Sequence, residues 1–154
     1  MNIKEKLNEL GYELPEVAAP AANYVPYKIA GNQLYIAGQI PFLNGEQMHI
    51  GVIGEDAGLD DGVEAAKACA LNILAQVDAA VDRDWSKVKQ CVKLGGFVNC
   101  TPDFTNHPKV MNGASDLIAE VMGKAGQHAR FAVGAPSLPL GVMVEIDAIF
   151  ELNL

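Results

Sequence analysis

Apolar residues recur at helical spacing in two long segments of the chain. The first segment begins at Asp60 or Asp61, runs to about Val81, and carries its apolar stripe at Val63, Ala66, Ala70, Ile73, Leu74 and Val77. The second spans residues 108–122, where Pro108 suits the first helical turn and Gly123 ends the pattern. A stripe with this period predicts a helix that packs against a core. We therefore expect two long amphipathic helices.

A shorter stretch of the same kind opens the chain. Residues 2–10 place three apolar side chains on one helical face and stop at Gly11. The passage that follows is rich in proline and alanine, and its prolines exclude a helix interior: Pro15, Pro20 and Pro26. We interpret residues 1–17 as a helical extension at the N-terminus of a single domain that covers residues 1–154.

Runs of apolar and β-branched residues, several of them alternating with polar ones, indicate the strands. They cover residues 24–29, 34–40, 88–98, 131–135 and 142–152. Gly31 and Asn32 predict a turn between the first two strands, and residues 138–141 predict a turn between the last two. Residues 44–62 are rich in Gly and Asp, which predicts a loop with room for one short strand near residues 49–53.

The element order ββ(β)αβαββ is typical of an α+β fold, with two helices on one face of a mixed or antiparallel sheet. The last strand indicates which face they cover. Its even-numbered residues from Val142 to Leu152 are all apolar and belong under the helices. The other side combines Met143 and Ile149 with three acids, so it suits either solvent or self-association.

Composition changes this picture mainly through charge. The 154 residues include 11 basic and 19 acidic side chains, a net charge of −8, whereas a protein that grips a nucleic-acid backbone needs a basic face. Nucleic acid is therefore not an expected partner. No apolar run approaches the ~18 residues of a membrane span, and the charged N-terminus is unlike a signal peptide. We expect a cytoplasmic protein that does not bind membranes.

Few residues carry recognisable chemistry. The sequence has no phosphate-binding loop, dinucleotide fingerprint, GxSxG elbow or HExxH motif. The cysteines form no CxxC pair and are expected to be buried or unreactive thiols: Cys69, Cys91 and Cys100. The histidines lie far apart without acidic neighbours, so neither a metal site nor a cofactor is expected: His49, His107 and His128.

Two ionisable residues stand in apolar strands. Arg130 lies near the start of one strand, and Glu145 lies within the last. Taken alone, each is explained as a solvated strand residue. If the two strands are neighbours, however, Arg130 and Glu145 can face one cleft. There an arginine fork suits a small carboxylate, and a glutamate can position or deprotonate water.

The surroundings of these two residues resemble a known family. The segment Gly38-Gln39-Ile40-Pro41 and the block Ala129-Arg130-(x7)-Leu138-Pro139-(x5)-Glu145-Ile146-Asp147-Ala148 are similar to the two signatures of the Rid family. Its members are reactive intermediate deaminases, also called YjgF-like proteins or L-PSP endoribonucleases. The resemblance covers about residues 20–152 and extends to the longer branch of that family.

The resemblance implies a chorismate-mutase-like fold, here with an extra N-terminal helix. It also implies a homotrimer whose sheets form a central barrel with a cleft between neighbouring subunits. The implied reaction is hydrolysis of a small enamine or imine, such as 2-aminoacrylate, to a 2-keto acid and ammonia without a cofactor. The chain would then be a hydrolase similar to 2-iminobutanoate/2-iminopropanoate deaminases, with a small carboxylate metabolite as its ligand.

The resemblance also implies roles for single residues. Arg130 matches the arginine that binds the substrate carboxylate, and Glu145 matches the glutamate that holds the attacking water. Tyr24 matches a tyrosine that lines the cleft, and Gly38 matches a glycine whose backbone contacts the ligand. Asn112 matches, across a gap, an asparagine from the neighbouring subunit. Without the resemblance, these last three are explained as a strand residue, a bulge glycine and a helix residue.

Two positions depart from the archetypal deaminases. Ala132 replaces a cysteine two residues after the arginine, and Phe131 replaces a small polar residue, so the pocket loses a thiol and can gain an aromatic wall. Three functions therefore stay open. The leading hypothesis is a deaminase; the second is a non-catalytic trimer that binds or senses a keto acid; the third, an endoribonuclease, is disfavoured by the net charge of −8.

Overall fold

One five-stranded sheet organises the chain, which the computed structural model describes over residues 1–17 and 22–154. Across the sheet the strands follow the order β1 (Tyr27–Ala30), β2 (Gln33–Gln39), β7 (Val144–Leu152), β5 (Val88–Asn99) and β6 (Ala129–Ala135). Neighbouring strands are antiparallel except β5 and β6, which run parallel. A separate hairpin consists of β3 (Phe42–Leu43) and β4 (Glu46–Gln47).

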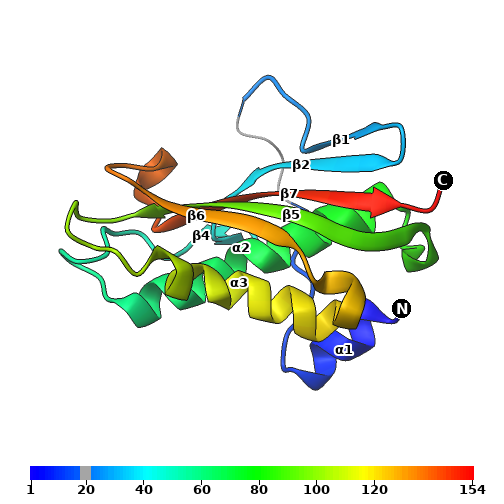
Figure 1. The fold of residues 1–154 in the computed structure, drawn as a ribbon, viewed down its shortest axis with the longest axis horizontal. Helices are drawn as coiled ribbons and strands as arrows, with labels where there is room; N and C mark the ends of the chain where they lie inside the picture. The colour runs from blue at the N-terminus through cyan, green and yellow to red at the C-terminus, as the bar shows by residue number, and fades with distance from the viewer. Residues whose placement is uncertain (18–21) are drawn as a thin grey trace.

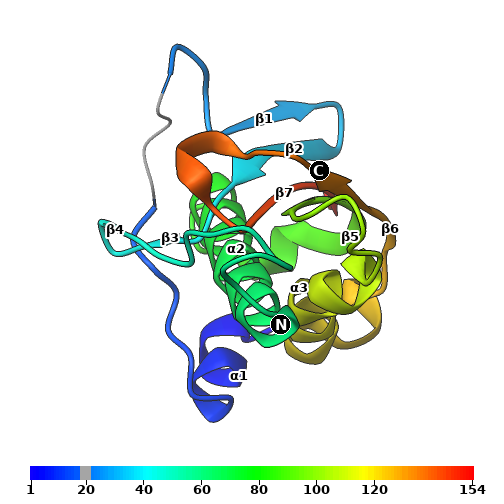
Figure 2. The ribbon, with the colours of Figure 1, turned by 90° about the vertical axis from the view of Figure 1, so that its left-hand side faces the viewer.

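Two long helices cover one face of this sheet, as Figures 1 and 2 show. They are α2 (Leu59–Ala80) and α3 (His107–Met122), and the short α1 (Ile3–Glu9) packs on the outer side of this helix layer. Single 3-10 turns occupy Trp85–Lys87, Gly123–Gly126 and Pro139–Gly141. The predicted α+β arrangement is confirmed.

The helix predictions are confirmed, with one change at the start of α2. Its N-cap is Gly58, and the predicted capping residue Asp61 lies inside the first turn. There the Asp61 carboxylate accepts the Gly58 N–H at 2.8 Å. This acid therefore satisfies a backbone donor at the helix start from within the helix.

The strand boundaries differ more from the prediction. The first strand starts at Tyr27 because Pro26 has no N–H for a ladder, so Tyr24 lies outside the sheet and is 50% exposed. No described strand covers residues 49–53; Ile50 instead forms an isolated bridge with Val142. Val142 follows the 3-10 turn and precedes the sheet, because β7 begins at Val144. Pro20 lies outside the described residues.

The two faces of the sheet differ as the last strand predicted. The even-numbered residues of β7 are buried under the helices, and its odd-numbered residues point the other way. We call this other side, away from α2 and α3, the open face (Figure 2). It carries large exposed apolar side chains beside its acids: Tyr35, Phe97, Phe131 and Val133.

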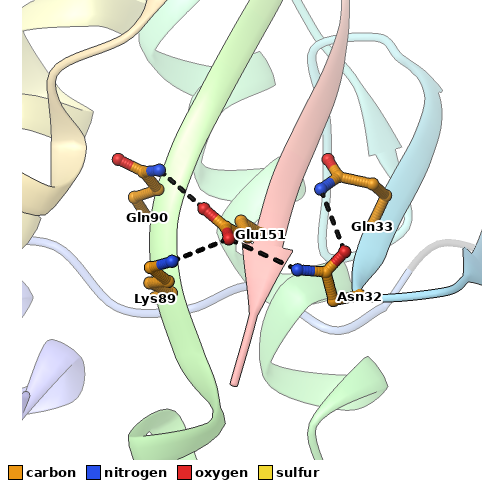
Figure 3. A network of polar contacts seen from close by, with 5 residues as sticks. All are labelled: Asn32, Gln33, Lys89, Gln90 and Glu151. Carbon is orange, nitrogen blue, oxygen red and sulfur yellow. Dashed lines mark hydrogen bonds and ion pairs between the residues drawn. The ribbon is translucent and has the colours of Figure 1, made fainter. Parts of the chain in front are cut away.

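A network around Glu151 joins three strands near one end of the sheet (Figure 3). The Glu151 carboxylate accepts hydrogen bonds from Lys89 at 2.8 Å, Gln90 at 2.6 Å and Asn32 at 3.3 Å. Asn32 in turn accepts from Gln33 at 3.4 Å. The hydrogen bonds from Lys89 and Gln90 lower the pKa of Glu151, which therefore has a structural role as an anion.

Candidate functional site

Arg130 lies on the edge strand β6 and faces the helices, because it is in register with the buried Leu94 of β5. One guanidinium nitrogen, Nη1, donates to Asn112 Oδ1 at 2.9 Å and to Ser115 Oγ at 3.0 Å. The other, Nη2, donates to the Pro108 carbonyl at 3.2 Å. None of these acceptors is a carboxylate, and Arg130 forms no ion pair with a described residue. The guanidinium is oriented by α3, and its charge stays available for an anion.

Ser115 links Arg130 to a histidine. His128 Nδ1 lies 2.6 Å from the Gly126 carbonyl oxygen, which can only accept, so Nδ1 carries the proton in the neutral ring. His128 Nε2 then accepts from the Ser115 hydroxyl at 2.9 Å. The sequence analysis missed this link. Its signal was the i, i+3 spacing of Asn112 and Ser115, which places both on one face of α3.

Glu145 occupies the open face of β7, next to the bulge in β2. A Cβ built on Gly38 would lie 2.5 Å from Glu145 Oε1, so the carboxylate rests against the backbone of this glycine. Burial, and then the Asp147 carboxylate, raises the pKa of Glu145. No donor among the described residues reaches this carboxylate. A half-buried carboxylate with free lone pairs is suited to accept a proton from water.

Arg130 and Glu145 do not meet within one chain. The condition for a shared cleft within one chain, that the two strands are neighbours, is not met, because β5 lies between β6 and β7. The register places Arg130 level with Ala148 of β7, three residues beyond Glu145, and on the opposite face. The connection through Pro139–Gly141 therefore passes the end of β5 instead of forming a hairpin.

The other predicted residues divide between the two faces. Asn112 Oδ1 accepts the hydrogen bond from Arg130 of its own chain. Its role toward a neighbouring subunit stays a prediction. Ala132 shares the helix-facing side of β6 with Arg130. Phe131 points to the open face, where its ring centroid lies 5.5 Å from that of Phe97. Within one chain, Phe131 is therefore not a wall of the space around Arg130.

A thiol lies farther along the same side of β6. Gly134 follows Ala132 there, and a Cβ on Gly134 would lie 2.7 Å from His107 Nε2 and 3.0 Å from Cys100 Sγ. These two atoms are 3.4 Å apart. Both residues line a cavity of about 570 Å³. A thiol therefore lies on the same side of β6 as Ala132, and it comes from the residue that follows β5.

The described residues offer neither a metal-binding cluster nor a membrane-spanning helix. No group of three or more His, Cys, Asp or Glu side chains gathers among them to hold a metal ion. None of their helices is both long and apolar enough to cross a bilayer. A cavity of about 900 Å³ lies between the N-terminal extension and the end of α2, and it contains none of the predicted site residues.

A comparison with models of protein families shows to which family the chain belongs. A family model described as "YjgF/chorismate_mutase-like, putative endoribonuclease" matches residues 4–152. The chain belongs to the YjgF family. The family predicted from the two signature segments, with its chorismate-mutase-like fold, is thereby confirmed.

Relatives of this YjgF-family chain match it over nearly its whole length. Protein TCP17 of Trypanosoma cruzi is 46% identical over 152 residues, which are 98% of this chain and 94% of TCP17. Among solved structures, the protein Atu1372 of Agrobacterium tumefaciens, of unknown function, is 47% identical with a TM-score of 0.92, covering 99% of this chain and 92% of Atu1372. A "putative endoribonuclease" of Shewanella oneidensis is 38% identical with a TM-score of 0.94, covering 99% of this chain and 100% of that protein. The N-terminal helix is therefore shared with these YjgF-family structures.

Proposed function

We propose that this YjgF-family protein hydrolyses small imines or enamines to 2-keto acids, in a cleft between copies of the chain in a homotrimer. In that cleft, Arg130 of one copy binds the substrate carboxylate, and Glu145 of another copy positions and deprotonates a water molecule. The observation that carries the proposal is the placement of these two groups on opposite faces of one sheet. Within residues 1–17 and 22–154, Arg130 has no counter-ion and Glu145 has no donor. Neighbouring copies can bring together what one chain keeps apart.

The open face supports association of this kind. Tyr35, Phe97, Phe131 and Val133 each leave 37–45% of their surface exposed there. Clustered exposed apolar side chains are typical of protein–protein contacts. The acids of the same face lie among them, and Glu145 is already half-buried in the single chain. A covered open face would raise the pKa of Glu145 further, which favours proton transfer near neutral pH.

The proposed reaction needs no covalent enzyme intermediate. The Arg130 guanidinium holds the carboxylate and so places the imine carbon against the water molecule. As the water oxygen bonds to that carbon, the Glu145 carboxylate accepts a water proton. It returns this proton to the imine nitrogen, which gives a carbinolamine. Glu145 then accepts the proton of the carbinolamine hydroxyl and passes it to the amino nitrogen, so that the carbon–nitrogen bond breaks, ammonia leaves, and the carbon–oxygen double bond of the 2-keto acid forms. Asn112 and Ser115 keep the guanidinium in place throughout.

A second candidate is a trimer that binds keto acids without turning over imines. Ala132 favours it, because the methyl group leaves no thiol beside Arg130 on the helix-facing side of β6. Endoribonuclease activity, the function in the names of some relatives, is disfavoured by the net charge of −8. Stabilisation of the folded state by 2-keto acids without any imine turnover would select the binding protein.

The test of the deaminase proposal compares the two arginines of the chain. An amino-acid oxidase generates imines in situ, semicarbazide competes for them, and 2-keto acid formation is measured over a panel of amino acids. We expect Arg130→Gln to lower kcat/KM roughly 100-fold or more, because a charged partner of the substrate is lost. Arg83→Gln, at the only other arginine, should leave the rate unchanged. Equal rates for Arg130→Gln and the wild type would refute the carboxylate-binding role.

Mixed oligomers test the placement of the site between copies. Arg130→Gln and Glu145→Gln chains are unfolded together, refolded as a mixture, and assayed beside each parent. If Arg130 and Glu145 act from different copies, random mixing should restore about a quarter of the wild-type activity. A mixture no more active than its parents would place both groups in the same copy. Light scattering should give a mass three times the 16.4 kDa of the chain.

A further inference from the structure

The cavity at the end of β6 holds a thiol beside an imidazole, apart from both Arg130 and Glu145. Its volume of about 570 Å³ lies in the range of small-molecule sites. Its walls are largely apolar and come from Val52, Pro102, Phe104 and Pro136. Three segments that are distant in sequence therefore converge here: the loop before α2, the start of α3 and the end of β6.

The geometry places Cys100 and His107 as an interacting pair. Cys100 Sγ lies 3.4 Å from His107 Nε2, within the distance of a hydrogen bond that involves sulfur. The Phe104 ring holds the imidazole edge-on, with centroids 5.5 Å apart and planes at 88°. Gly134 leaves the room for this contact, since a Cβ there would meet both Sγ and Nε2 within 3.0 Å.

The surroundings of Cys100 favour the protonated form of its thiol. Burial raises the pKa of the Cys100 thiol, a backbone hydrogen bond from Ala135 opposes this, and the nearby Asp103 carboxylate adds to the increase. A protonated thiol needs a base at the moment when it attacks. The His107 Nε2 atom lies where such a base must be.

We propose that Cys100 and His107 form a second reactive site, which captures small uncharged α,β-unsaturated carbonyl compounds. Cys100 Sγ bonds to the β-carbon while the electron pair of the carbon–carbon double bond moves toward the carbonyl oxygen. His107 Nε2 takes the thiol proton and delivers it to the α-carbon, which leaves a thioether on Cys100. All atoms come from the thiol and the electrophile, and no oxidant takes part.

Charge selects uncharged members of this class. Glu55 is the one ionisable carboxylate that lines the described cavity, and Asp103 acts on the thiol from nearby. Both repel an anion, so acrylamide should react faster than acrylate. This inference does not depend on the proposed deamination, because it uses neither Arg130 nor Glu145.

The test follows alkylation of the folded protein by N-ethylmaleimide, acrylamide and acrylate, using intact mass and peptide mapping. We expect one adduct on Cys100, formed faster than on glutathione at the same pH, while Cys69 and Cys91, which do not line this cavity, stay unmodified. The rate should saturate with reagent concentration because the cavity binds before the bond forms. His107→Gln should slow alkylation about tenfold or more, and His49→Gln, outside the cavity lining, should not.

Gly134→Ala keeps both reactive side chains but crowds them apart, so it should also slow alkylation. If His107→Gln fails to fold, the alkylation rate of Gly134→Ala tests the proposal instead. A first adduct on Cys69 or Cys91, a wild-type rate no higher than that of glutathione, or an unchanged rate in a folded His107→Gln or Gly134→Ala variant would overturn the proposal. Faster reaction of acrylate would overturn the preference for uncharged compounds. Cys100→Ser should abolish the adduct and leave imine hydrolysis intact, which separates this site from the proposed deaminase.

Discussion

Glu145 and Glu151 stand on the same strand and the same open face, six residues apart, in opposite electrostatic settings. Glu151 lies among donors from β5 and from the β1–β2 turn, and its pKa is lowered (Figure 3). Glu145 rests against the Gly38 backbone beside another acid, and its pKa is raised. One carboxylate ties strands together, and the other is left with unused lone pairs.

The residues opposite them on β5 explain the difference. Glu151 is in register with Gln90, whose amide donates to it, whereas Glu145 is in register with Phe97, which has no polar atom to offer. Two acids on one face of one strand therefore acquire different roles from their neighbours: Glu151 accepts from Lys89, Gln90 and Asn32, whereas Glu145 faces Phe97 and Asp147. Which of the two acids is available to a substrate therefore depends on the strands that neighbour β7, and the sequence of β7 alone does not show it.

The largest effect is expected when each of the two acids is replaced by its amide. Glu145→Gln should lower imine hydrolysis roughly 100-fold, the lower end of the range for loss of a general base. Glu151→Gln should leave the rate within about twofold, because its carboxylate is committed to Lys89, Gln90 and Asn32. The measurement is kcat/KM in the coupled imine assay. Equal losses in both variants would show that the two acids do not differ in function.

The sequence predicts that Glu145 and Glu151 share one face of the last strand, but it does not predict which strands pair with that strand. The alternation in the last strand predicted correctly that all three acids share one face, because strand side chains alternate with period two. The helices were predictable for the same kind of reason. The strand order was not: the predicted turn at Leu138-Pro139-Leu140-Gly141 left open whether the last two strands are neighbours, and β5 lies between β6 and β7. Order across a sheet depends on long-range pairing that local patterns do not encode.

The same limit applied to the candidate site. Arg130 stood out because a cation begins an apolar strand, but its acceptors Asn112 and Ser115 lie on a helix that only the fold brings near. His107 and Cys100 were set aside as an isolated histidine and an unreactive thiol. They are seven residues apart with a loop between them, and no periodic pattern predicts their contact.

A smaller effect is expected when the backbone under Glu145 is altered. Gly38→Ala adds a Cβ 2.5 Å from Glu145 Oε1, so the carboxylate must move while keeping its charge. We expect kcat to fall about tenfold, because a shift of the order of 1 Å misplaces the water. Gly58→Ala is the control, since a Cβ there meets only Asp61 Oδ2 at 3.7 Å, an ordinary van der Waals contact. A Gly38→Ala variant with wild-type kcat would indicate that the position of Glu145 is not critical.

The smallest expected effect is the pH dependence of stability, and the two acids should contribute with opposite signs. The raised pKa of Glu145 means that the folded state holds its proton more tightly, so the free energy of unfolding falls as pH rises above the ordinary value of 4.5. The lowered pKa of Glu151 means that its contribution to stability is complete above that value and is lost as pH falls below it.

Urea unfolding at one protein concentration, from about pH 3 to about pH 7, measures both contributions to the free energy of unfolding. Relative to the wild type, Glu145→Gln should gain stability toward neutral pH, and Glu151→Gln should lose stability at neutral pH but converge with it in acid. Parallel curves for the two variants would mean that their environments in solution are alike, and the distinction between them would fail.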